Sequence, residues 1–108
     1  MTNSKYKAPK HLRVGTRRWV EQVAHDFDLE SHHLKLLLMA GQAWDRAEAA
    51  REAITEHGMV ADGRFGPKPR PEIGIEHNSM IAFARMVREI GLDVNDPDDS
   101  RPPRVGGY

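Results

Sequence analysis

Apolar positions recur at helical spacing in three segments of this chain, and turn residues separate the segments. The periodic segments cover about residues 16–27, 31–57 and 72–90. The second ends before Gly58 and the third before Gly91, and glycine is a typical residue just after a helix. The pattern therefore predicts three helices, the second much longer than the others.

The first two predicted helices are joined by a short turn. Trp19, Val23 and Phe27 repeat every four residues and give the first helix one apolar stripe. Ser31 is the expected N-cap of the second helix, because its hydroxyl can accept from a free backbone N–H. Both tryptophans lie on apolar stripes, so we expect Trp19 and Trp44 to anchor the core rather than to stack on bases.

The long second helix is predicted to have two apolar faces. One face runs along its whole length and consists of Leu36, Ala40, Ala43, Trp44, Ala47 and Ile54. The other covers only the first half and consists of Leu34, Leu37, Leu38 and Gly41. Gly41 is interpreted as a glycine that permits close helix packing. A helix that is apolar on two sides needs neighbours on both, so we expect copies of the chain to associate.

The segment between the second and third helices is rich in glycine and proline. Asp62-Gly63 favours a tight turn, so residues 59–65 are either a small β-hairpin or a loop. Three prolines within residues 66–71 predict an extended linker, with Pro71 in the first turn of the next helix. The expected apolar stripe of the third helix consists of Met80, Phe83, Ala84, Val87 and Ile90.

These elements predict an all-α domain at residues 12–92. The long helix should be antiparallel to the C-terminal helix, with the first helix against the first half of the long one. Residues 1–11 are expected to be a flexible basic arm, and residues 93–108 a disordered tail with almost no apolar content. No internal repeat or second domain is visible.

The chain has equal numbers of acidic and basic residues, but their distribution is uneven. No acidic residue precedes Glu21. Six cations precede it, and they are the expected contacts to DNA phosphates: Lys5, Lys7, Lys10, Arg13, Arg17 and Arg18. A solvated arm without a partner is the alternative interpretation of the same charges.

The sequence lacks the usual signatures of catalysis and cofactor binding. It has no cysteine, no phosphate-binding glycine loop and no serine-nucleophile motif. His25, His32 and His33 are close in sequence, but neighbouring histidines on a helix diverge by about 100°, so no metal site is expected. We therefore expect a protein that is not an enzyme and that binds no cofactor. No segment is long and apolar enough to predict a membrane span.

Several short motifs occur in a fixed order along the chain. The motifs are His11-Leu12, Trp19, Phe27-Asp28-Leu29, Asp45-Arg46, Glu48-Ala49, Glu56-His57-Gly58, Lys68-Pro69-Arg70-Pro71, Ile90-Gly91-Leu92-Asp93 and Arg101-Pro102-Pro103-Arg104. Their order and spacing resemble the small subunit of the terminase of tailed bacteriophages or prophages, in the short branch of that family. The resemblance covers about residues 11–104.

The resemblance implies a non-catalytic component of the viral genome packaging motor in the host bacterial cytoplasm. Small terminase subunits form homo-oligomeric rings, bind double-stranded viral DNA, and recruit and regulate the large subunit, which carries the ATPase and the nuclease. The two-faced long helix fits ring formation, with its full-length face as the expected oligomerisation surface. Arg101 and Arg104 are the expected docking residues for the large subunit.

Two other functions remain open from the sequence. A small dimeric helical regulator that binds DNA would carry the same basic residues. A structural interaction module that never touches DNA would carry the same helices. Particle size in solution distinguishes a dimeric regulator from a ring. DNA binding at low salt distinguishes both of these from a module that never touches DNA.

Overall fold

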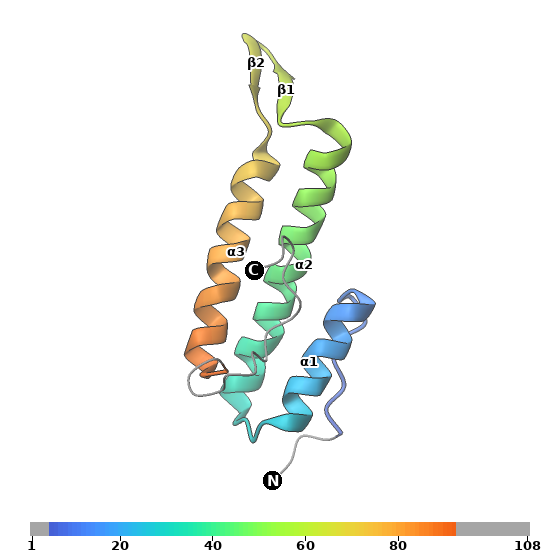
Figure 1. The fold of residues 1–108 in the computed structure, drawn as a ribbon, viewed down its shortest axis with the longest axis vertical. Helices are drawn as coiled ribbons and strands as arrows, with labels where there is room; N and C mark the ends of the chain where they lie inside the picture. The colour runs from blue at the N-terminus through green and yellow to red at the C-terminus, as the bar shows by residue number, and fades with distance from the viewer. Residues whose placement is uncertain (1–4, 93–108) are drawn as a thin grey trace.

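A computed structural model describes residues 5–92 as three helices and one β-hairpin (Figure 1). The elements in chain order are α1 (Val14–Asp26), α2 (Ser31–His57), β1 (Val60–Gly63), β2 (Gly66–Pro69) and α3 (Pro71–Ile90). The predicted mostly helical fold with three helices is confirmed. The tail expected at residues 93–108, with Arg101 and Arg104, lies outside the described residues, as do residues 1–4.

The helices form one layered bundle in which α2 is central. Figure 1 shows α2 and α3 side by side and antiparallel, with α1 next to α2 in the half away from the hairpin. Gly41 permits the close approach of α1: a Cβ at this position would lie 3.1 Å from methyl carbons of both Thr16 and Val20. The expected antiparallel pair and the packing role of Gly41 are thus confirmed.

The core is centred where the three helices meet. The ring of Phe83 in α3 lies 5.7 Å from Trp19 in α1 and 5.0 Å from Trp44 in α2, measured between centroids. Both pairs are tilted, an arrangement that aromatic quadrupoles favour. Leu37 and Val20 are fully buried beside them. Both tryptophans therefore belong to the packed interior, as their stripes predicted.

Glycine predicted the end of a helix correctly, whereas the serine predicted to cap the start of a helix does not cap it. Gly91 adopts a left-handed conformation, φ 86°, and its N–H donates to the Val87 carbonyl at 3.1 Å. At the start of α2 the cap position is Glu30, and Ser31 is already helical, with no side-chain cap hydrogen bond. The prediction that Ser31 caps this helix is wrong.

The glycine- and proline-rich segment forms a β-hairpin rather than a hairpin followed by a linker. β1 pairs antiparallel with β2, with Val60 opposite Pro69 and Gly63 opposite Gly66. The turn is therefore Arg64-Phe65, two residues beyond the expected Asp62-Gly63 turn. The two prolines of β2 have no backbone N–H. The free edge of this strand therefore offers few hydrogen-bond donors, which disfavours the pairing of a third strand.

The apolar stripe of α3 is only partly buried. Phe83 and Val87 are buried as expected, whereas Met80 and Ala84 are exposed. Ser79 is buried instead. The predicted stripe is wrong at Met80 and Ala84, because both lie on a side of α3 that faces solvent.

Candidate nucleic-acid interface

All six cations expected to contact DNA lie along the N-terminal segment and the first turns of α1, and the five other than Arg13 form one group. Lys5, Lys7, Lys10 and Arg18 are exposed, and Arg17 is half-buried. Within residues 5–92, none of the five is in an ion pair with a carboxylate. Their charge can therefore be neutralised by an external anion such as a DNA phosphate.

The segment that carries the three lysines packs against α1 at Tyr6 and Ala8, within residues 5–11 of the expected arm. Ala8 is buried, and its N–H donates to the Glu21 carboxylate at 2.9 Å. Tyr6 packs against the core, and burial, followed by the nearby Glu21 charge, raises the pKa of its phenol. The lysines at 5, 7 and 10 thus project from a fixed stretch of backbone.

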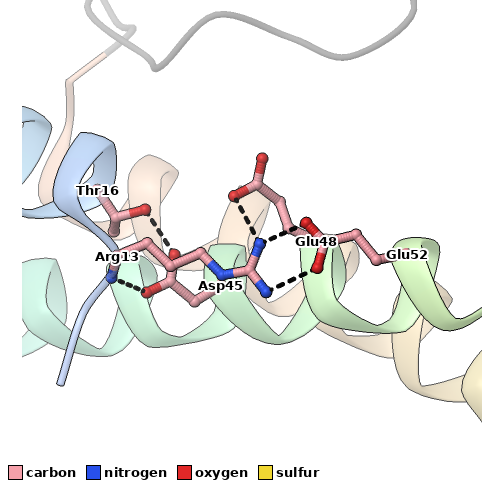
Figure 2. Close-up of polar contacts among 5 residues, drawn as sticks. All are labelled: Arg13, Thr16, Asp45, Glu48 and Glu52. Carbon is pink, nitrogen blue, oxygen red and sulfur yellow. Dashed lines mark hydrogen bonds and ion pairs between the residues drawn. The ribbon is translucent and has the colours of Figure 1, made fainter.

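Arg13 lies in a cluster of carboxylates, as Figure 2 shows. Its guanidinium donates to both Glu52 oxygens, at 2.7 and 3.0 Å, and lies 3.9 Å from Glu48. The hydrogen bond to Glu52 raises the pKa of Arg13 and lowers that of Glu52. Arg13 therefore differs from the other five cations, because its charge is already compensated by α2, and its contact to DNA stays a prediction.

The same cluster caps the first turn of α1 from outside that helix. Asp45 in α2 accepts from the Arg13 backbone N–H at 2.8 Å and from the buried Thr16 hydroxyl (Figure 2). The first turn of α1 has no acidic residue of its own, and its cap residue makes no side-chain hydrogen bond. A carboxylate near a helix N-terminus stabilises the free N–H groups and the helix dipole. Asp45 therefore fixes the direction in which the basic segment leaves α1.

The face of α2 that was expected to join copies lies mostly inside one copy. Five of its six residues are buried by α1 and α3, and Leu36 is half-buried. The buried five are Ala40, Ala43, Trp44, Ala47 and Ile54. The expectation that this face meets a second copy is corrected, because neighbouring helices of the same chain already cover it.

The β-hairpin presents exposed residues that the sequence analysis did not assign to any site. Phe65 at its tip is 96% exposed, and the Arg64 guanidinium lies 5.6 Å from the centroid of its ring. Met59 and Val60 are also exposed at its base. Gly63-Arg64-Phe65-Gly66 could have indicated this tip, because two glycines bracket one cation and one aromatic residue.

One group of potential metal ligands occurs among residues 5–92. Ligand atoms of Glu30, His32 and His33 lie within 4.8 Å of one another, whereas His25 is not part of the group. The group lies at the N-terminal end of α2, where the helix dipole is positive and disfavours a cation. Three ligands at such a position form a weaker site than the four of a structural zinc centre.

Within the part of the chain that the structure describes, no helix is both long and apolar enough to cross a membrane.

Comparisons of the sequence with protein-family models and curated proteins, and of the fold with solved structures, find no match.

Proposed function

We propose that this protein is the small subunit of a phage terminase, a non-catalytic component of the genome packaging motor that binds double-stranded viral DNA in the host cytoplasm. It would act as a homo-oligomeric ring and recruit and regulate the large ATPase–nuclease subunit. The proposal rests first on the order of short motifs along the chain, which resembles that family. The antiparallel pair α2–α3, with α1 beside it, is a suitable scaffold for such an adaptor.

The observation that carries the DNA-binding part is the set of five cations on the N-terminal segment and α1. They are not paired with carboxylates in residues 5–92, and the backbone that carries the lysines is anchored through Ala8 and Glu21. Contacts from such cations go to phosphates and are insensitive to base sequence. Anchoring reduces the conformational entropy lost on binding, which favours affinity.

The salt dependence of DNA binding tests this assignment. Fluorescence anisotropy with a DNA duplex measures the binding constant at several salt concentrations. A plot of the logarithm of this constant against the logarithm of the salt concentration has a negative slope, whose magnitude falls by about 0.9 for each phosphate contact removed. The variant with Lys5, Lys7 and Lys10 changed to alanine should therefore have a clearly shallower slope than the wild type.

Arg13→Ala is the matched control, because its charge is already compensated by Glu52. It should leave the slope unchanged. An unchanged slope in the lysine variant would show that DNA binds elsewhere. Absence of binding at low salt would instead support a structural interaction module.

Particle size tests the ring. Light scattering of the purified chain at micromolar concentration should give a mass well above two copies. A dimer that binds DNA would support the alternative of a small helical regulator. Co-purification with a large terminase ATPase–nuclease co-expressed with this chain would test the proposed partner directly.

A further inference from the structure

The hairpin tip is an exposed aromatic anchor held in a defined conformation. Gly63 and Gly66 face each other at the end of the ladder, and a Cβ on Gly63 would lie 2.6 Å from the Gly66 carbonyl oxygen. Glycine at this point therefore allows the tight turn that presents Arg64 and Phe65. Phe65 is 96% exposed, so a partner that buried its ring would remove a large apolar surface from water.

A groove of matching character lies on the bundle just beyond the start of α1. Its cavity has a volume of about 500 Å³, within the range of pockets that enclose small ligands. Trp44, Ala47 and Met80 form its apolar lining. Met80 is 46% exposed, so the groove is open to solvent. α1 lies beside α2 only in the half of the bundle away from the hairpin (Figure 1).

The charges of the two surfaces are complementary. The hairpin and its base, residues 59–70, carry Arg64, Lys68 and Arg70 against the single acid Asp62. The groove is lined by three carboxylates and one cation. These are Glu48, Glu52 and Glu76, with Arg51.

The ion pairs already present leave part of this negative charge uncompensated. Arg51 binds Glu76 at 2.8 Å, and the single guanidinium of Arg13 is shared by Glu48 and Glu52. An incoming Arg64 would therefore meet carboxylates that are not fully neutralised.

The tip and the groove cannot meet within one copy. Trp44 lies 13 residues before the last residue of α2, which is about 20 Å of helix at 1.5 Å per residue. The hairpin continues away from that end of the bundle (Figure 1). A hairpin tip that enters the groove must therefore belong to another copy of the chain.

We propose that the hairpin tip of one copy inserts Phe65 into the α2–α3 groove of a second copy, with Arg64 facing the groove carboxylates. The two surfaces differ, so the contact is heterologous and, repeated from copy to copy, closes into a ring or extends into a filament. This inference rests on the proposed function, for which it supplies the contact between subunits.

Two surface variants test the contact without disturbing the core. Phe65→Ser removes the anchor, and Met80→Arg places a cation in the groove opposite Arg64. Each variant should raise the concentration needed for assembly, measured by sedimentation velocity, by roughly 30-fold or more, as expected for a central aromatic anchor. Ile81→Arg is the matched control, since Ile81 is 45% exposed on the same helix but does not line the groove.

Mixing the two defective variants gives the sharpest result. A copy with an intact tip and a copy with an intact groove can form one good contact, so an equimolar mixture should contain dimers while each variant alone remains monomeric. Circular dichroism should show that both variants keep the wild-type helix content.

The outcomes separate this inference from the proposed function. If the wild type forms large assemblies and both variants do so at the same concentrations, the tip–groove contact is wrong while the ring remains supported. If the wild type is monomeric at every concentration, the ring and the contact both fail. A wild type that stops at a dimer would contradict the heterologous geometry.

Discussion

The two halves of the helical bundle differ in how they cover their apolar side chains. In the half next to the turn between α1 and α2, three helices surround Trp19, Trp44 and Phe83. In the half next to the hairpin only α2 and α3 remain, and Met80 and Phe65 are exposed. Phenylalanine is thus 5% exposed at position 83 and 96% exposed at position 65. Its place in the fold, rather than its residue type, decides whether it stabilises the chain or is available to a partner.

Helix length explains this difference. α1 has 13 residues and α2 has 27, which correspond to about 20 and 40 Å of helix. α1 can therefore cover only half of α2. At the point where α1 begins, Asp45 caps it and Arg13 reaches across to Glu52. The boundary between the covered and the open half is thus marked by this polar cluster (Figure 2).

The largest expected effect compares the two phenylalanines. Phe83→Ala should lower the free energy of unfolding by about 3–5 kcal/mol, because it leaves a cavity where the three helices meet. Phe65→Ala should change it by less than about 0.5 kcal/mol at concentrations too low for copies to associate, because the ring is exposed in a single copy. Urea denaturation followed by circular dichroism measures both. Equal losses for the two variants would contradict the division of the bundle into a covered and an open half.

A second comparison uses two glycines in helices. Gly41→Leu should destabilise the protein by about 1–3 kcal/mol, since Thr16 and Val20 leave no room for a side chain. Gly74→Ala, in the open half, meets nothing within 4 Å and should stabilise by about 0.5–1 kcal/mol through helix propensity. Thermal denaturation midpoints should move in opposite directions. A stabilising Gly41→Leu would show that α1 does not pack closely on α2.

The smallest expected effect concerns the polar cluster at the boundary. The hydrogen bond from Arg13 lowers the pKa of Glu52 in the folded protein. The resulting stabilisation is present above the ordinary pKa of glutamate, about 4.3, and is lost as the pH falls through the folded-state pKa. The wild type should therefore have a slightly higher melting temperature than Glu52→Gln at neutral pH, and the difference should vanish in acid.

Glu89→Gln serves as the control for that pH series, because Glu89 is exposed and lies outside the cluster. It should show no loss of stability at neutral pH. A difference in melting temperature between the wild type and Glu52→Gln that grows as the pH falls would contradict this prediction.

Much of the fold could be predicted from local sequence signals. Periodic apolar residues identified all three helices, and Gly58 and Gly91 marked two of their ends. The hairpin was only one of two alternatives, because its turn is Arg64-Phe65 and its second strand contains prolines that locally favour an extended linker. Pairing between strands is a long-range interaction, so local preferences did not fix its register.

The candidate sites depended far more on packing. The sequence by itself determined that cations are concentrated before Glu21, because that is a property of residue order. Only the tertiary structure decided that Arg13 is compensated by Glu52, that the apolar face of α2 is covered within one copy, and that Phe65 and Met80 are exposed. The physical reason is that charge compensation and burial depend on which residues distant in the chain come within a few ångströms. The lengths and crossing of the helices set that proximity, and no local pattern contains it.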